Sequence, residues 1–200
     1  MVMIKNIILD MGNVLLSYDP QIPLDTYCDS QEEKELIRQV LFGSDIWLEA
    51  DKGLLKNAEL FDRVKQQVAP DHWAALQNCC EHWDICMKPI AGAREFCERA
   101  KAGKYGLYVL SNANDKFYDY FERLLPLQFF DGVVVSSDIR MIKPDREAFE
   151  YVLKTYGLKA EECLFVDDSA CNVDAARAIG MTAHLFRNDY RALDGYLTEK

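Results

Sequence analysis

Hydrophobic residues gather in five short runs, each closed by a polar or glycine-containing stretch. The runs cover 7–9, 107–110, 133–135, 164–166 and 183–186. Runs this continuous are typical of strands buried on both faces of a sheet. Helical periodicity fills the segments between the later runs, over 93–102, 115–125, 146–156 and 173–179. Strands and helices in alternation predict an α/β fold with a parallel sheet between two layers of helices.

The segment that follows the first predicted strand has a different pattern. Residues 32–42, 58–68 and 72–80 have helical periodicity, and no convincing strand lies among them. An insertion at this point would sit over the carboxyl end of the sheet, where open α/β folds bind ligands. We therefore expect residues 1–16 and 89–200 to form a catalytic core, and residues 17–88 to form a helical cap that acts as a lid.

Composition narrows the class of protein. The chain has 200 residues, half of them hydrophobic, which is enough for one core and a small satellite domain. The formal net charge of −10 argues against binding to nucleic acid or to anionic lipid. No apolar stretch approaches the roughly 20 residues that a membrane span needs. The implied partner is instead a small molecule, and an anionic ligand would have to be met by a metal or a few Lys and Arg side chains.

The seven cysteines are odd in number and irregularly spaced, and no signal-peptide pattern precedes them. They are interpreted as reduced thiols of a cytoplasmic protein. Cys79, Cys80, His82 and Cys86 lie close together in the sequence, but no second Cys or His pair is spaced to complete a zinc site. Core thiols are therefore the favoured interpretation.

Polar side chains stand at or just after the ends of four predicted strands. They are Asp10, Ser111, Asn112, Lys143, Asp167 and Asp168. Each has a purely structural explanation as a cap, a turn residue or a solvated charge, with Asp168 as the N-cap of the next helix. Four such coincidences at one sheet edge are less probable than a single site. The pair Asp167 and Asp168 is hardest to explain structurally, because adjacent carboxylates repel unless a cation neutralises them.

These residue types suit the transfer of a phosphoryl group. A phosphate monoester repels a carboxylate nucleophile, so the site must supply positive charge and hydrogen-bond donors. Mg²⁺ prefers hard oxygen ligands, which Asp10, Asp167 and the Gly12 carbonyl can provide. Lys143 would balance the charges of phosphate and nucleophile, while the Ser111 hydroxyl and neighbouring amides hold phosphoryl oxygens.

Four segments, ILDMGNVL, VLSNAN, KPDREAF and FVDDSACN, resemble the motifs of the haloacid dehalogenase-like hydrolase superfamily in order and separation. The resemblance spans nearly the whole chain. It implies a Rossmann-like three-layer core with a helical cap inserted after strand 1. It also implies that Asp10 forms an aspartyl-phosphate, that Ser111 and Lys143 are catalytic groups that bind the phosphoryl group, and that Asp167 holds Mg²⁺. The candidate substrate-binding positions are Asn112, Gly12 and Asn13, and the candidate metal ligands are Asp10, Gly12, Asp167 and Asp168.

The LDMGNVL segment, with Trp47 and Gly53 in the expected cap, is most similar to one branch of the superfamily. That branch contains bacterial α-D-glucose-1-phosphate phosphatases and the phosphatase domains of epoxide hydrolases. The resemblance implies an Mg²⁺-dependent phosphatase that acts on a small phosphorylated metabolite. A sugar phosphate, in particular a sugar 1-phosphate, is the favoured substrate.

Gly12 departs from the superfamily pattern. Most phosphatases of this kind have a second Asp there, which protonates the leaving group and then activates water, and its loss would cost on the order of 10²–10⁴ in rate. One explanation is a leaving group that needs little protonation, such as the anomeric oxygen of a sugar 1-phosphate. Another is a cap carboxylate, Asp45, Glu49 or Asp51, that moves in on closure. A third is a protein that binds a phosphorylated ligand without hydrolysing it.

A 2-haloacid dehalogenase is the alternative enzyme, because such enzymes use the same nucleophile and lack the second Asp. The acidic pair Asp167 and Asp168 argues against it, since metal-free displacement has no use for an acidic metal site. Substrate specificity depends on the cap. Four aromatic residues there either line the substrate space or pack the cap core, namely Tyr18, Trp47, Trp73 and Trp83.

Overall fold

The computed structural model describes residues 3–197 and contains one five-stranded sheet. Its strands are β1 (Asn6–Leu9), β2 (Gly106–Ser111), β3 (Gly132–Val135), β4 (Cys163–Asp167) and β5 (Thr182–Leu185). All neighbours are parallel, in the order β3-β2-β1-β4-β5. Each strand begins and ends within one residue of its predicted bounds. The predicted α/β class with a parallel sheet is confirmed.

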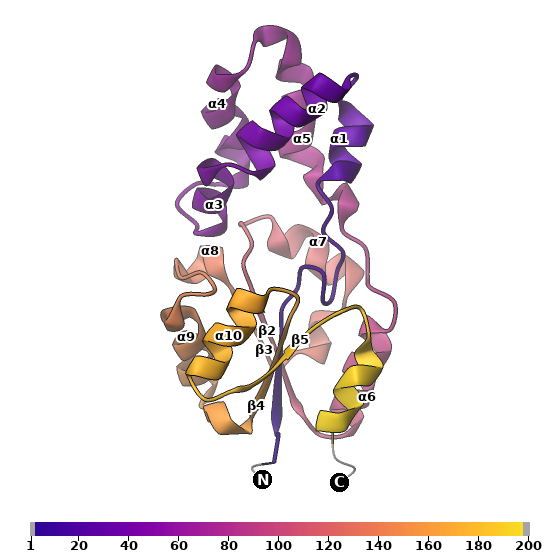
Figure 1. Cartoon of the computed structure of the whole chain (residues 1–200), viewed down its shortest axis with the longest axis vertical. Coiled ribbons are helices and arrows are strands. Elements are labelled where there is room, and N and C mark those ends of the chain that lie inside the picture. Colours follow the sequence, from indigo (N-terminus) through magenta and orange to yellow (C-terminus); the bar gives the residue numbers. More distant parts are fainter. Residues whose placement is uncertain (1–2, 198–200) are drawn as a thin grey trace.

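Helices cover both faces of this sheet (Figure 1). They are α6 (Ala93–Ala102), α7 (Phe117–Leu124), α8 (Ser136–Ile139), α9 (Arg146–Tyr156) and α10 (Ala170–Ala178), with 3₁₀ turns at Leu127–Phe129, Ala160–Glu162 and Tyr190–Tyr196. Side chains of β1 alternate between the layers, because successive residues of a strand point to opposite faces. Ile7 and Leu9 belong to the hydrophobic cluster of Phe96 from α6, whereas Ile8 belongs to that of Phe149 from α9. The strands are therefore buried on both sides, as their apolar sequences predict.

Two helix boundaries differ from the prediction. The helix expected over 115–125 spans Phe117–Leu124, and the one expected over 173–179 begins earlier, at Ala170. Ser169 rather than Asp168 is therefore the N-cap residue of α10, and its side chain makes no capping hydrogen bond. The interpretation of Asp168 as an N-cap is wrong, which frees its carboxylate for other contacts.

A helical unit lies between β1 and α6 and stands above the carboxyl ends of the strands (Figure 1). It contains α1 (Gln21–Tyr27), α2 (Gln31–Ile37), a π-helical turn (Arg38–Phe42), α3 (Asp45–Asp51), α4 (Leu60–Val64) and α5 (Trp73–His82), with 3₁₀ turns at Asn57–Glu59, Lys65–Gln67, Pro70–His72 and Trp83–Cys86. Leu24, Leu41 and Leu60 belong to a hydrophobic cluster of its own. The two chain segments that join it to the sheet run side by side, where the Ser17 amide donates to the Lys88 carbonyl at 2.8 Å. The core–cap boundary at residues 16–17 and 88–89 is proposed for this point.

Six of the seven cysteines are buried and Cys171 is exposed, so most of them are core thiols, as interpreted from the sequence. Burial raises the pKa of Cys80 to about 12, which keeps this thiol protonated at neutral pH. Within residues 3–197, no helix has both the length and the apolarity that crossing a bilayer requires.

Candidate active site

The parallel register brings the acidic strand ends together. Leu9 of β1 pairs with Val166 of β4, and the Asp10 amide then donates to the Val166 carbonyl at 2.9 Å. Asp10 directly follows β1 and Asp167 is the last residue of β4, so the two carboxylates leave adjacent strands at the same edge. This edge faces the cap, as expected for a ligand site of an open α/β sheet.

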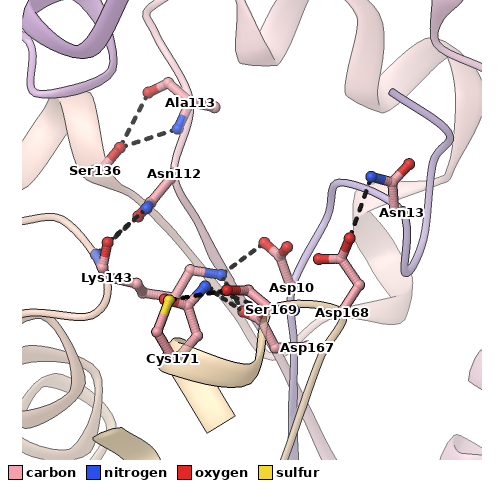
Figure 2. Close-up of polar contacts among 11 residues, drawn as sticks. Asp10, Asn13, Asn112, Ala113, Ser136, Lys143, Asp167, Asp168, Ser169 and Cys171 are labelled. Atoms are coloured by element: carbon pink, nitrogen blue, oxygen red, sulfur yellow. Dashed lines mark hydrogen bonds and ion pairs between the residues drawn. The ribbon is translucent and has the colours of Figure 1, made fainter. Parts of the chain in front are cut away.

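Lys143 lies between these two carboxylates (Figure 2). Its ammonium nitrogen is 2.7 Å from Asp10 Oδ1 and 2.7 Å from Asp167 Oδ2, and all three side chains are buried. Burial raises the pKa of Asp10, an effect that the Lys143 charge opposes and the Asp167 charge reinforces. Burial also disfavours the charged form of Lys143, yet the two carboxylates outweigh it and raise the Lys143 pKa. The ammonium is therefore held in its charged form beside Asp10.

Hydrogen bonds from the start of α10 fix the orientation of Asp167. Its Oδ1 accepts from the Ser169 amide at 2.8 Å, and the Asn172 side-chain amide donates to Oδ1 and Oδ2 at 3.1 and 3.0 Å. The sequence alone assigns no role to Asn172. Its position one turn into α10 places its amide over Asp167, which is a geometric reason that sequence spacing alone does not reveal.

A divalent cation fits the acidic cluster. Asp10, Asp167 and Asp168 each offer a carboxylate oxygen, and these oxygens lie within 4.8 Å of one another. Asp168 is held in place by the Asn13 side-chain amide, which donates to its Oδ2 at 3.2 Å (Figure 2). Three carboxylates meet one ammonium here, so the cluster has an excess of negative charge. Hard oxygen donors with excess negative charge match the preference of Mg²⁺.

The remaining predicted positions make different contacts. Both polar atoms of the Asn112 side chain bond the Lys143 backbone, at 2.8 and 2.9 Å, so Asn112 holds the loop that carries the ammonium. Ser111 is buried, and its hydroxyl has no hydrogen-bond partner among residues 3–197. The Asn13 amide donates to the Leu16 carbonyl at 2.7 Å, inside a tight turn where Asn13 has a φ of 53°. Substrate binding by Asn112, Gly12 and Asn13 stays a prediction.

A cavity of about 120 Å³ separates these groups from the cap. Its walls come from both parts of the chain: Asp10, Met11, Gly12, Asn112, Ala113, Asn114, Tyr120, Lys143 and Asn172 below, and Tyr18, Trp47, Asp51, Trp83 and Met87 above. Tyr18, Trp47 and Trp83 therefore line the space over the nucleophile. They also pack against one another, with ring centroids 5.3–6.4 Å apart. Trp73 is absent from these walls and packs on Phe61 elsewhere in the cap.

One of the three cap carboxylates considered from the sequence reaches this cavity. Asp51, the last residue of α3, lines it together with Asp10 and Lys143. Asp45 begins α3 and is exposed, while Glu49 lies 3.8 Å from Arg63 on another side of the cap. Nothing in the sequence distinguishes Asp51 from the other two carboxylates, because the difference depends on how α3 packs against the core.

The sequence is similar to those of known proteins. A family model for haloacid dehalogenase-like hydrolases matches residues 4–180. The sesquiterpene phosphatase astK of Aspergillus oryzae is 28% identical over 179 residues, which are 88% of this chain and 87% of that protein. The drimenol cyclase drtB of Aspergillus calidoustus is 31% identical over 92% of this chain, which spans only 34% of that longer protein.

Solved structures superpose on this chain. The HAD family enzyme BT-2542 of Bacteroides thetaiotaomicron superposes with a TM-score of 0.76 at 25% identity, covering 96% of this chain and 98% of that one. A second structure of that enzyme, in complex with magnesium and inorganic phosphate, also has a TM-score of 0.76, at 24% identity over 95% of this chain and 98% of that one. The L-2-haloacid dehalogenase of Xanthobacter autotrophicus shares the fold at a TM-score of 0.64 and 19% identity, over 90% of this chain and 76% of that one.

Proposed function

The chain belongs to the haloacid dehalogenase-like hydrolase family, and we propose that it is an Mg²⁺-dependent phosphatase that forms an aspartyl-phosphate on Asp10. The observation that carries this proposal is the buried cluster in which the Lys143 ammonium lies 2.7 Å from the carboxylates of both Asp10 and Asp167. A carboxylate nucleophile beside a fixed cation, with two further acids for a metal, is suited to attack on a phosphate ester.

The roles of the residues follow from their positions. A carboxylate oxygen of Asp10 attacks phosphorus, and the Lys143 ammonium offsets the charge that gathers on the phosphoryl oxygens. Bound by Asp10, Asp167 and Asp168, Mg²⁺ would supply further positive charge to the same oxygens. The Ser111 hydroxyl, which has no hydrogen-bond partner in the described part of the chain, is available to donate a hydrogen bond to the phosphoryl group. Asn112 and Asn172 hold Lys143 and Asp167 in position.

The acidic pair also supports phosphatase chemistry over its alternatives. A metal-free dehalogenase has no use for Asp168 beside Asp167, and the dehalogenase structures match this chain at no more than 20% identity, which supports the fold alone. A protein that only binds phosphate has no use for a buried carboxylate such as Asp10 beside the bound anion. Phosphate transfer uses every group of the cluster.

The organic part of the substrate would occupy the space above Asp10. A sugar 1-phosphate remains one candidate, because its anomeric oxygen leaves with little help from an acid. The aromatic walls made by Tyr18, Trp47 and Trp83 favour a second class, phosphates whose organic group has apolar faces. Similarity to a sesquiterpene phosphatase along most of both chains supports this second class, of which a short isoprenyl phosphate is the natural probe.

A phosphate-release screen tests the proposal. The purified chain is assayed with Mg²⁺ against sugar 1-phosphates, sugar 6-phosphates and short isoprenyl phosphates. We expect turnover in at least one class, loss of turnover in EDTA, and loss in Asp10→Asn without a change in thermal unfolding above a few degrees. No phosphate release from any substrate, or halide release from a 2-haloacid in EDTA, would overturn the proposal.

A further inference from the structure

We infer that Asp51, carried on the cap, is the acid and base that protonates the leaving group and activates water in place of the residue missing at Gly12. The inference rests on the proposed phosphatase function and extends it to a second catalytic residue. Its starting point is geometric, because Asp51 ends α3 at the wall of the cavity that also contains Asp10 and Lys143. The substrate's leaving oxygen has to lie on the cap side of the phosphorus, opposite the attacking carboxylate.

Hydrogen bonds to the core hold Asp51 at the cavity. The Ser136 hydroxyl donates to the Asp51 backbone carbonyl at 2.5 Å, and the Asn114 amide donates to the Asp51 carboxylate. The Ser136 oxygen also accepts from the Ala113 amide at 2.9 Å (Figure 2), so Ser136 connects the end of α3 to the loop after β2. A proton-transfer group needs this kind of fixed placement near the substrate.

Gly53 shows how closely the cap approaches the core at this point. Its φ is +67°, and a Cβ placed on it would lie 2.0 Å from the Ser137 carbonyl oxygen of α8. Only glycine fits there, since a backbone oxygen cannot rotate away. The end of α3 therefore lies against α8 (Figure 1). This contact places Asp51, two residues before Gly53, at the cavity.

The surroundings of Asp51 suit proton transfer at neutral pH. Burial raises its pKa to about 7, against the smaller opposing effect of the Asn114 amide. Two tyrosine hydroxyls face Asp51, those of Tyr18 and Tyr120, and their pKa values are raised by burial and by the Asp51 charge. Lys143 and Asp10 lie across the cavity. A carboxyl group with a pKa near the working pH can both give and take a proton efficiently.

The other titratable groups of the cavity are less suited to this task. Asp10 is the nucleophile, and Lys143 is held charged by two carboxylates. Tyr18 and Tyr120 have pKa values raised above the ordinary tyrosine range, so their hydroxyls are weak acids and their basic, deprotonated forms are not populated at neutral pH. Among the titratable residues that line the cavity, Asp51 is left as the acid and base.

The proposed reaction has two steps, and Asp51 transfers a proton in each. In the first, an Asp10 oxygen bonds to phosphorus, the bond from phosphorus to the organic oxygen breaks, and that oxygen takes the proton of Asp51 and leaves as an alcohol. In the second, the Asp51 carboxylate takes a proton from water while the water oxygen bonds to phosphorus. The bond between Asp10 and phosphorus then breaks, which releases inorganic phosphate and restores both carboxyl groups.

Leaving-group dependence tests this role. In Asp51→Asn the amide oxygen can still accept from the Asn114 amide, so the fold should be kept. We expect kcat/KM for an alkyl phosphate substrate to fall by a factor on the order of 10²–10⁴. With 4-nitrophenyl phosphate, whose nitrophenolate leaves unprotonated, kcat/KM should fall less than about tenfold. Glu49→Gln, on the same helix but outside the cavity, is the matched control and should leave kcat/KM for both substrates unchanged.

The second step has a signature of its own. Because water activation also needs Asp51, Asp51→Asn should release about one equivalent of nitrophenolate in a burst and then turn over slowly. In a pH profile, the wild-type kcat/KM for the alkyl phosphate should fall above pH 7, because Asp51 loses its proton. This fall should be absent in Asp51→Asn.

Restoring an acid at position 12 gives a rescue. A Cβ at Gly12 would meet no atom closer than Asp10 Oδ2 at 4.0 Å, so the first atom of an Asp side chain has room there. Gly12→Asp combined with Asp51→Asn should recover at least tenfold of the lost alkyl phosphate activity. Equal losses for both phosphate substrates, or no loss, would overturn the role of Asp51 while leaving the phosphatase function standing. An inactive wild type would overturn both.

Discussion

Replacing Gly53 with Ala tests whether activity depends on the position of Asp51, apart from any change in the stability of the fold. The new Cβ would lie 2.0 Å from the Ser137 oxygen, whereas real Cβ atoms essentially never approach within 3.0 Å of such an atom. The end of α3 must therefore move by about 1 Å. A displacement of about 1 Å at a catalytic group can cost about 10²-fold in rate, so we expect kcat/KM for alkyl phosphates to fall by about that factor.

The same substitution also strains the backbone, and Gly157→Ala isolates that effect. Gly157 ends α9 with a φ of +65°, but nothing lies within 4 Å of a Cβ placed on it. A non-glycine residue in the left-handed region costs about 1–2 kcal/mol, so Gly157→Ala should melt roughly 2–8 °C lower, and Gly53→Ala, which also has the clash with Ser137, should melt at least as much lower. Only Gly53→Ala should lose activity.

Phosphate release and thermal unfolding, measured on both variants, check this reasoning. A Gly53→Ala enzyme with wild-type kcat/KM would refute the claim that the α3–α8 contact places a catalytic group. Equal activity losses in Gly53→Ala and Gly157→Ala would refute it as well, because the loss would then come from backbone strain alone.

Three further changes act on the site itself. Lys143→Met should reduce phosphate release by a factor on the order of 10²–10³. In urea unfolding with EDTA present it should also cost about 3–5 kcal/mol, because Asp10 and Asp167 lose their buried counterion. Asn172→Ala should weaken Mg²⁺ activation by about 10–100-fold in an Mg²⁺ titration of activity, since it removes both side-chain bonds to Asp167. Asp51→Asn should gain stability relative to wild type as pH rises from 3.8 to about 7 in urea unfolding, because the wild-type folded state binds the Asp51 proton more tightly than the unfolded state does. An unchanged difference across that range would contradict the raised pKa of the partly buried Asp51.

The sheet could be predicted closely because its signal is local. Strands buried on both faces have continuous apolar sequences, and all five were found within one residue of their bounds. Their order was not predictable in the same way, because it depends on which strands pair. The polar residues at the strand ends were correctly expected at one edge, since parallel strands leave little choice.

The cap was harder to predict from the sequence. Helices α1 and α3 are seven residues each, too short for a clear periodic pattern, and neither was expected. The helix predicted over 32–42 continues beyond Ile37 as a π-helical turn, which spacing arguments do not foresee. Asp51 itself lies far from Asp10 in the sequence, and its position in the cavity depends on the docking of α3 against α8.

An acid on the cap has a consequence that an acid at position 12 would not have. A residue two positions after Asp10 stays beside the phosphorus whether the cap is open or closed, whereas Asp51 is there only while Gly53 rests on α8. Proton transfer is then coupled to closure, so a substrate that cannot be enclosed meets a nucleophile without an acid. With the cap open, we would therefore expect neither leaving-group protonation nor water activation by Asp51. Under the proposed role of Asp51, Gly12 would make closure of the cap a requirement for turnover, and the aromatic side chains that line the cavity would select the organic groups that permit closure.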